Sequence, residues 1–335
     1  MCLLKGGKEA ARTNKALHDA FTRGIRSVLG GGQSGLHISQ AEIDSLCSLV
    51  QLVESREDVQ KLLRLDQCID LVIPRGSNAL VRFVQSNTNI PVLGHADGIC
   101  HIYADADSVS TEERLKKAVA IIRDSKLQYV AACNALEALL VHQEAAQTLL
   151  PVLGPALAKE GVKFKADKKA AALLPAEATE AAKPEDFCTE WLAPILSVRV
   201  VDTLMEALEA INTNGSHHTD GSLSYSPANV ETFMKGVGSA DVFCNCSTRF
   251  ADGYRFGFNA EVGIATGRTH ARGPVGIEGL CTYAYRLYGE GHTVAGIEEE
   301  KERGLPGFTH QPLVADKAAW SEESIDFYEA GRLRH

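Results

Sequence analysis

The residue best suited to chemistry is Cys133, which stands in the stretch QYVAACNALEALLVH over residues 128–142. Its neighbours are small, and no second ligand or bridging partner stands beside it. Helical spacing before it and an apolar run after it predict a tight connection between a helix and a strand. Backbone N–H groups at such a joint can lower a thiol pKa and stabilise an oxyanion. The alternative is a small buried hydrophobe, the commoner role of a cysteine.

Two further segments have the pattern strand, turn, helix that suits a phosphate. In VIPRGSNAL (72–80), Gly76 and Ser77 form the turn, where free N–H groups and the helix dipole favour an anion. LLKGGKEA (3–10) repeats the form and puts Lys5 at a strand end, within reach of a ribose or phosphate oxygen. A single glycine is far less specific than GxGxxG. A plain turn and a solvated lysine remain the alternatives.

A long loop over residues 244–279 is rich in arginine and glycine and has hardly any regular period. A loop of this length inside a compact domain is usually functional. Ser247, Thr248 and Arg249 at its predicted strand end, with Arg255 close behind, are candidates to bind an acidic or phosphorylated substrate. The alternative for these residues is turn chemistry.

Composition excludes several classes of partner. The chain has 335 residues, 45% of them hydrophobic, and a net charge of -9, which argues against nucleic acid. No apolar run approaches the ~20 residues that span a membrane, and the start is not a signal peptide. The nine cysteines are odd in number, and Cys244-Asn-Cys246 is too tight for a zinc knuckle. We therefore expect no metal, reduced cysteines and a cytoplasmic protein.

The elements that would position these residues alternate between strand and helix. Strands are expected at 50–54, 69–74, 90–95, 99–105, 138–142, 195–201 and 240–247, and helices at 8–29, 56–66, 111–126, 143–161, 203–212 and 226–238. Such alternation favours right-handed βαβ units and a mostly parallel sheet. The Ala- and Lys-rich segment 165–187 is expected to be a surface loop or a loose helix, and HADG (95–98) and HTDGS (218–222) to be polar turns.

These segments together resemble a known family. LLKGGKEA, IDLVIPRGS, HADGICHIYAD, AACNALE, STRFADGYRFG and HARGPVGIEGL follow one another as in glutamate-5-semialdehyde dehydrogenases, also called gamma-glutamyl phosphate reductases. The resemblance runs from about residue 2 to 289. GHADGIC, GSHHTD and STRFADGYRFG are most similar to the reductase half of eukaryotic bifunctional pyrroline-carboxylate synthase.

The resemblance implies an α/β fold of the aldehyde-dehydrogenase type, with a Rossmann-type cofactor domain and an α/β catalytic domain. We expect a partial NADP-binding domain at 1–128, a catalytic domain at 129–280 whose last part, 255–280, returns toward the cofactor domain, and a peripheral tail at 281–335. It further implies NADPH-dependent reduction of L-glutamyl 5-phosphate to glutamate 5-semialdehyde and phosphate, the second step of proline synthesis.

Roles for individual residues come from the same resemblance. Cys133 takes the position of the nucleophile that forms a thioester with the substrate. Lys5 follows the cofactor strand, and Gly76 and Ser77 form the turn under the pyrophosphate. Glu190, in TEWLAPILSV, matches the glutamate that contacts the nicotinamide ribose. The STRF segment lies where the superfamily closes its substrate pocket.

The sequence also departs from the family pattern. Val130 replaces a proline, Ala138 replaces a threonine, and FGFNAEVGIAT stands where FGLGAEVGIST is usual. Relative to the family pattern, we expect the given sequence to lack an upstream part that holds the first cofactor-domain elements and an Arg-Pro-Asn oxyanion segment, and to lack a kinase half. One alternative is therefore a non-catalytic paralogue that keeps the fold as an assembly module. Another is an acylating aldehyde dehydrogenase for a different acyl donor. We expect a small-molecule substrate and a homo-oligomer.

Overall fold

The computed structural model describes residues 2–4, 53, 55–258, 260–284, 293 and 295. The chain divides into two compact units, Met1–Cys281 and Thr282–His335, and the helices and strands given below all lie in the first. Lys5, the predicted helix at 8–29 and nearly all of the predicted strand at 50–54 lie outside the described residues.

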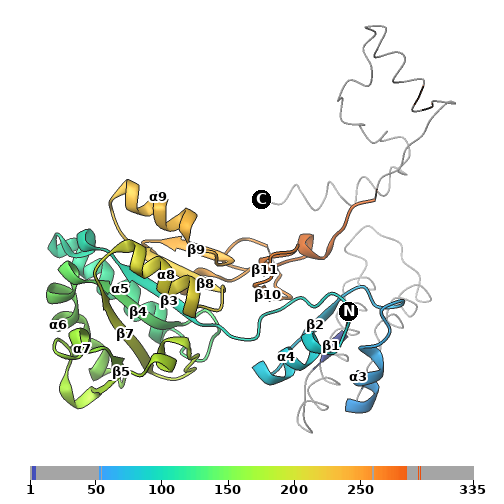
Figure 1. Cartoon of the computed structure of the whole chain (residues 1–335), viewed down its shortest axis with the longest axis horizontal. Helices are drawn as coiled ribbons and strands as arrows, with labels where there is room; N and C mark the ends of the chain where they lie inside the picture. Colours follow the sequence, from blue (N-terminus) through green and yellow to red (C-terminus); the bar gives the residue numbers. More distant parts are fainter. Residues whose placement is uncertain are drawn as a thin grey trace, which may run out of the picture. The chain divides into compact units, whose positions relative to one another are not determined.

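A seven-stranded, wholly parallel sheet forms the larger part of the described chain (Figure 1). Its most apolar strands occupy the middle and are buried along almost their whole length, as expected for strands covered on both faces. The strand order across the sheet is β6 (Thr179–Ala181), β5 (Lys163–Ala166), β7 (Ile195–Val201), β4 (Leu136–His142), β3 (Cys100–Ala104), β8 (Thr219–Leu223) and β9 (Asp241–Cys244).

Helices pack on both faces of this sheet. One apolar core joins β3, β4, β5 and β7 to α5 (Glu112–Leu127), α6 (Gln143–Lys159) and α7 (Lys168–Ala171). A second core joins the other face to α8 (Leu204–Asn214) and α9 (Pro227–Gly236). Thr111 caps α5 and Thr203 caps α8, each accepting a hydrogen bond from a backbone N–H of the first turn. Each helix therefore begins where a strand-to-helix turn supplies a hydroxyl.

Smaller elements lie outside the seven-stranded sheet. β1 (Cys2–Leu4) pairs in parallel with β2 (Val72–Pro74), and α3 (Arg56–Leu62) and α4 (Asn78–Ser86) accompany them around a core of Leu63, Val72, Val84 and Ile90. β10 (Gly263–Ala265) and β11 (Gly273–Val275) form an antiparallel pair. Short 3₁₀ turns are η1 (Ala106–Val109), η2 (Ala176–Ala178), η3 (Pro184–Cys188), η4 (Thr248–Phe250) and η5 (Glu278–Leu280).

The predicted alternation of strands and helices is confirmed from residue 56 to 247, with three corrections. The segment 165–187, expected to be a surface loop or a loose helix, contains the short helix α7 but also part of β5 and all of β6. The expected turn at 218–222 is mostly strand β8, because its polar residues are buried and paired there. The expected strand at 90–95 forms only an isolated bridge between Val92 and Val72. The first two differences arise because short strands and buried polar strands do not have an apolar period. In the third, an apolar run indicated a strand where only one bridge forms.

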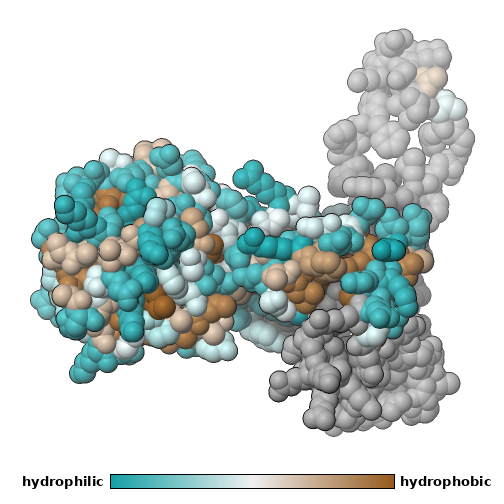
Figure 2. All heavy atoms as spheres, turned by 60° about the horizontal axis from the view of Figure 1, so that its bottom comes forward, coloured by the Kyte–Doolittle hydropathy of each residue, from teal (hydrophilic) through white to brown (hydrophobic). Residues whose placement is uncertain are grey.

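The surface of the sheet region carries mainly hydrophilic residues on the face shown in Figure 2, with hydrophobic residues between them. Among the described residues, no helix has both the length and the apolar character needed to cross a membrane.

Candidate active site

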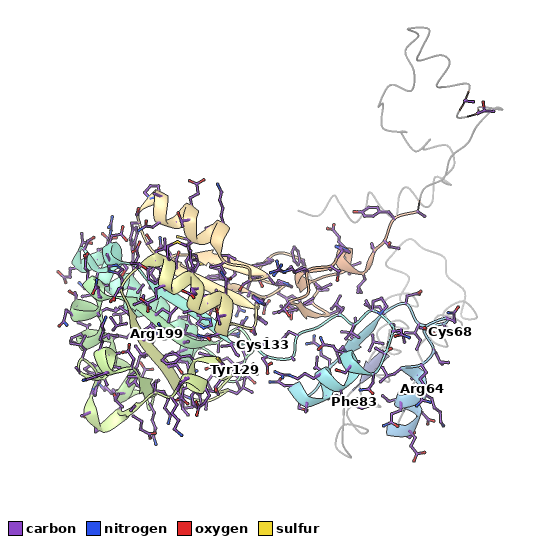
Figure 3. All side chains as sticks on the ribbon, viewed as in Figure 1. Arg64, Cys68, Phe83, Tyr129, Cys133 and Arg199 are labelled. Atoms are coloured by element: carbon purple, nitrogen blue, oxygen red, sulfur yellow. The ribbon has the colours of Figure 1, made fainter. Side chains whose placement is uncertain are left out.

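Four candidate residues lie at the same edge of the parallel sheet. Cys133 belongs to the loop that precedes β4, and Glu190 precedes β7. His95 stands before β3, and His218 directly precedes β8. The amino ends of parallel strands meet at one edge, which brings these side chains together from distant parts of the sequence. Figure 3 shows Cys133 close to Tyr129, at the end of the sheet region.

The backbone of the Cys133 loop is held against the start of β3. A methyl group added at Gly98 would come within 2.0 Å of the Cys133 carbonyl oxygen, so only glycine allows this approach. Cys100 Sγ donates to the same oxygen at 3.3 Å, and Asn134 Nδ2 donates to the Ala251 carbonyl at 2.7 Å. The loop is thus fixed on both sides of its cysteine.

The thiol lies in an environment that opposes its ionisation. Burial raises the pKa of Cys133 to about 11, and the charges of Glu190 and Glu261 add to the rise. The charge of Arg249 and a backbone hydrogen bond at Cys133 itself oppose it. A protonated thiol is a weak nucleophile, so this cysteine needs a proton acceptor or a bound cation before it can react. The two histidines supply such groups, because one ring nitrogen of each lies within 4.8 Å of the others and of Cys133 Sγ.

The histidines are held in defined orientations. His218 is completely buried, and burial keeps its pKa well below the usual value, so the ring is neutral. Its ring meets that of His95 edge to face, with centroids 4.6 Å apart. His217, just before it, adopts a left-handed backbone with φ of 59°, a conformation that clusters at functional sites. The sequence showed both histidines only as parts of polar turns. His218 stands directly before β8, and that position was the signal that could have identified it.

Glu190 is aimed at the same place by the chain around it. Its carboxylate accepts hydrogen bonds from the backbone N–H of Gly98 at 2.9 Å and from Asn78 Nδ2 at 3.0 Å. Two residues later, Leu192 has a left-handed φ of 51°. Glu190 therefore links the start of α4 to the start of β3, next to the cysteine loop.

A buried ion pair holds the segment that carries Glu190 against the sheet. Lys126 Nζ and Glu137 Oε2 lie 2.6 Å apart, and both side chains are fully buried. Burial raises the pKa of Glu137 to about 7, and the neighbouring Lys126 charge opposes that rise. The second carboxylate oxygen accepts a hydrogen bond from the Leu192 N–H at 3.2 Å. The pair thus connects α5 and β4 to the segment that carries Glu190.

A cavity of about 200 Å³ opens at this edge of the sheet. Gly76, Cys133 and Glu190 all line it, so the structure brings together three of the predicted site residues. Ser77 is not among the lining residues. Its hydroxyl caps α4 instead, accepting a hydrogen bond from the Leu80 N–H. The predicted strand, turn and helix at 72–86 are confirmed, and the phosphate contacts of Gly76 and Ser77 stay predictions.

The predicted anion-binding cluster lies on the turn η4 and just beyond it. Ser247 and Thr248 point inward: both are buried, and Ser125 Oγ donates to Ser247 Oγ at 3.1 Å. Arg249 is half-buried and donates from Nε to Gln128 Oε1 at 2.8 Å. The exposed Arg255 donates to the Arg249 carbonyl. Of these four side chains, Arg249 is the one whose charge acts on Cys133.

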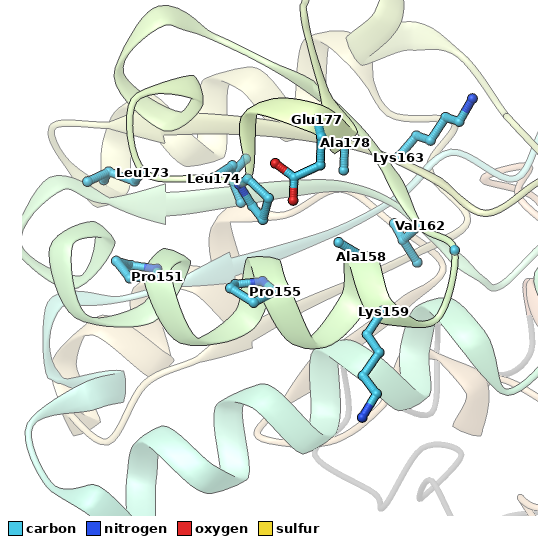
Figure 4. A pocket seen from close by; sticks show the side chains of 12 residues that line it. Pro151, Pro155, Ala158, Lys159, Val162, Lys163, Leu173, Leu174, Glu177 and Ala178 are labelled. Atoms are coloured by element: carbon cyan, nitrogen blue, oxygen red, sulfur yellow. The ribbon is translucent and has the colours of Figure 1, made fainter.

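A larger hollow, of about 770 Å³, lies elsewhere, along the outer side of α6 (Figure 4). Pro151, Pro155 and Lys159 line it from the helix, and Leu174 and Glu177 line it from the following segment. No cysteine or histidine lines it. Its size exceeds that of the cavity at Cys133, but the chemistry of its walls offers no nucleophile or acid–base group beyond Lys and Glu side chains.

Comparison with known proteins gives a consistent result. The chain is 48% identical over 309 residues to a gamma-glutamyl phosphate reductase of Trichormus variabilis, covering 92% of this chain and 65% of that protein. A crystal structure of gamma-glutamyl phosphate reductase from Thermotoga maritima matches with a TM-score of 0.74 and 36% identity, covering 87% of this chain and 66% of that one. No protein-family model matches.

A more distant structure matches in fold alone. An acetylating aldehyde dehydrogenase from Geobacillus thermoglucosidasius has a TM-score of 0.51 at 19% identity, over 70% of this chain and 61% of that one. The predicted aldehyde-dehydrogenase-like α/β fold is thereby confirmed. The chain spans about 65% of the length of the curated relatives that it matches.

Proposed function

We propose that this chain, a homologue of the gamma-glutamyl phosphate reductases, reduces L-glutamyl 5-phosphate to L-glutamate 5-semialdehyde and phosphate with NADPH. The observation that carries the proposal is the shared cavity, in which Cys133 faces Glu190 and Gly76. These three residues come from separate elements, and the family resemblance gives all three positions a role in one reaction.

The first chemical step belongs to Cys133. Its sulfur attacks the acyl carbon of glutamyl phosphate, the bond from that carbon to the phosphate oxygen breaks, and phosphate leaves with the bonding electrons. The thiol proton must go to a base first, because burial raises the pKa of Cys133 to about 11. His95 and His218 lie within 4.8 Å and are the acceptors that we propose, directly or through one water.

The second step returns the enzyme to its starting state. When bound, a reduced nicotinamide supplies a hydride to the thioester carbon. The carbon–sulfur bond then breaks, the aldehyde forms, and the sulfur of Cys133 regains a proton. Gly98 keeps the cysteine backbone in place during both steps, because no side chain separates β3 from the loop.

The residues around the cavity fit a nicotinamide cofactor. We propose that Glu190 holds the ribose next to the nicotinamide, since its carboxylate is already fixed by Gly98 and Asn78 at the cavity that Cys133 lines. The turn at Gly76 would lie under the pyrophosphate, and Lys5 would contact the ribose or a phosphate. The choice of NADPH rather than NADH is part of the proposal.

Arg249 is our candidate for the substrate phosphate. Its guanidinium lowers the pKa of Cys133 and so favours the thiolate that attacks the acyl carbon. Ser247 and Thr248 are turned inward, so we assign the anion contact to Arg249, with Arg255 bracing its backbone. The competing hypothesis is a non-catalytic paralogue. The Val130 and Ala138 substitutions favour it, and the intact convergence on Cys133 argues against it.

The test is Cys133→Ala, with Cys246→Ser as the matched control, because Cys246 is a half-buried thiol that does not line the cavity. We expect Cys133→Ala to abolish NADPH-dependent reduction and to leave NADPH binding within a few-fold, while Cys246→Ser retains activity. Glutamyl phosphate should protect Cys133 from iodoacetamide, as read by peptide mass spectrometry. Protection of Cys100 or Cys246 instead would show that the assignment is wrong.

A further inference from the structure

The cluster of His95, Cys133 and His218 brings together more donor atoms than the transfer of a single thiol proton requires. One nitrogen of each imidazole and the Cys133 sulfur lie within 4.8 Å of one another. The three residues precede three different strands of the sheet, so nothing in their sequence spacing signals a cluster. The sequence therefore predicted no metal site.

The hydrogen bonds of His95 fix which of its nitrogens is free. His95 Nδ1 lies 2.9 Å from the carbonyl oxygen of Ile264. A carbonyl oxygen can only accept, so Nδ1 must carry the hydrogen. In the neutral ring, Nε2 then keeps its lone pair, and no partner for that nitrogen is found among the described residues.

The same reasoning applies to His218 through a short relay. The Thr219 hydroxyl lies 3.5 Å from Asp241 Oδ2, a carboxylate oxygen to which it donates. The hydroxyl oxygen is then free to accept from His218 Nδ1, 2.8 Å away. His218 Nε2 keeps its lone pair, is buried, and has no hydrogen-bond partner within the described part of the chain.

A buried nitrogen without a hydrogen-bond partner destabilises the folded protein, so its presence calls for a ligand. Two imidazole nitrogens and one thiolate are a characteristic donor set for Zn²⁺. Metal-bound histidines almost always donate their other ring N–H to a carbonyl or a carboxylate, and here Ile264 and the Thr219–Asp241 relay accept those bonds. The outer shell of a zinc site is therefore already built.

We propose that His95, Cys133 and His218 bind one Zn²⁺ ion, and, resting on the function proposed above for Cys133, that the bound ion blocks the cysteine as a nucleophile. Binding forms two N–Zn bonds and one S–Zn bond and releases the thiol proton to solvent. The fourth tetrahedral position is left to water. Zn²⁺ thus holds the protein in an inactive, oxidation-protected form, and its removal returns the free thiol.

Binding of Zn²⁺ requires the three donor atoms to move slightly closer together. Donor atoms around tetrahedral Zn²⁺ are about 3.3–3.6 Å apart, from bond lengths of about 2.0–2.3 Å. The present upper separation of 4.8 Å must therefore shrink by roughly 1 Å. The side chains of His95 and Cys133 are only half-buried, so they can turn toward the buried His218 while the backbone of the Cys133 loop stays in place.

The experiment measures metal binding directly, without substrate. Metal-free protein is titrated with Zn²⁺ against a chromophoric chelator, and Co²⁺ is used in parallel to report a thiolate-to-metal charge-transfer band. The variants are Cys133→Ser and the half-buried His95→Gln, with Cys246→Ser as the control. Circular dichroism confirms that each variant is folded.

We expect tight binding of one Zn²⁺ that Cys133→Ser and His95→Gln each weaken more than about 100-fold, beyond the 10–100-fold typical of losing an outer-shell partner. The Co²⁺ band should vanish in Cys133→Ser and persist in Cys246→Ser. The chain holds nine cysteines and eleven histidines, so binding that is equal in all variants would reveal a different site and overturn the proposal. Absence of the Co²⁺ band in the unaltered protein would overturn it as well.

Discussion

Buried polar groups differ between the two ends of the strands in the seven-stranded sheet, which we call its amino edge and its carboxyl edge. At the amino edge, before β4 and β8, Cys133 has a raised pKa and His218 Nε2 has no partner. At the carboxyl edge, after β3, Asp105 accepts hydrogen bonds from Tyr103 Oη, Ser224 Oγ, Asn229 Nδ2 and the Ala106 N–H. One edge has reactive groups left open, and the other has a carboxylate that is fully occupied.

This difference locates the site better than a general rule does. Ligands of open α/β sheets usually bind beyond the carboxyl ends of the strands. Here that edge is closed by the Asp105 network, and the candidate nucleophile lies at the amino edge. At the amino ends, the unpartnered His218 Nε2 lies beside the candidate nucleophile.

The pKa values of two buried aspartates, Asp105 and Asp241, shift in opposite directions at the two edges. Burial by itself would raise the pKa of Asp105, but hydrogen bonds from Asn229 and Ser224 outweigh it and lower that pKa. At the amino edge, burial raises the pKa of Asp241 to about 6, against weaker opposition from Thr219 and Arg272. The first carboxyl group favours folding when charged, and the second favours folding when neutral.

The largest effect is expected from breaking the closed edge with Asp105→Ala. Several buried donors would lose their acceptor, at about 1–3 kcal/mol each, so we expect the free energy of unfolding to fall by at least about 3 kcal/mol. Because the pKa of Asp105 is lowered on folding, its contribution is present above the unfolded pKa and is lost as the pH falls. Urea denaturation at neutral and acid pH measures both.

The control for that variant is Asp202→Ala, an exposed aspartate paired with Lys169 on the surface. Such a pair contributes about 0–1 kcal/mol. Equal losses of stability in the two variants would contradict the importance given to the carboxyl edge.

At the amino edge, Asp241→Asn is expected to raise the free energy of unfolding rather than lower it, because asparagine resembles the neutral form of the acid. The ordinary pKa of 3.8 rises to about 6 in the folded protein, so stability is highest below pH 4 and falls as the pH passes through 6. The variant should therefore be more stable than the unaltered protein at pH 8, by up to about 3 kcal/mol, and equal to it near pH 4. Thermal unfolding of both proteins at pH 4 and pH 8 measures this difference. A variant less stable than the unaltered protein at pH 8 would refute the raised pKa of Asp241.

The smallest effect is expected from Arg249→Ala, which leaves the amino edge intact but removes its cation. A charge-assisted contact with phosphate is worth about 1.5–3 kcal/mol, so substrate use should fall roughly tenfold to a hundredfold in kcat/KM. Alkylation of Cys133 should also slow, because the positive charge that lowers its pKa is gone. Arg199→Ala, on strand β7, is the control. An unchanged KM and kcat would place the anion site elsewhere.

The sequence predicted what depends on local pattern. The apolar runs of β4 and β7, the period of α5, and the position of Cys133 between helix and strand needed no partner to be recognised. β8 was missed because Asp220 is buried against His101 and Ser239, and hydropathy does not show such pairing. β6 was missed because it is a three-residue edge strand with exposed side chains. The cluster of His95 and His218 with Cys133 depends on strand order, which no local window contains.

The contact of Gly98 with the Cys133 carbonyl limits how the cysteine loop could be engineered into another protein. The loop that carries the cysteine does not adopt its position by itself, because Gly98, in the segment that leads into β3, lets the backbone of the loop approach closely. A graft that moves residues 128–135 onto another parallel scaffold must also install glycine at the position facing the carbonyl. Two segments that are distant in sequence must therefore be transferred together, because the loop can pack in place only where the facing residue has no Cβ.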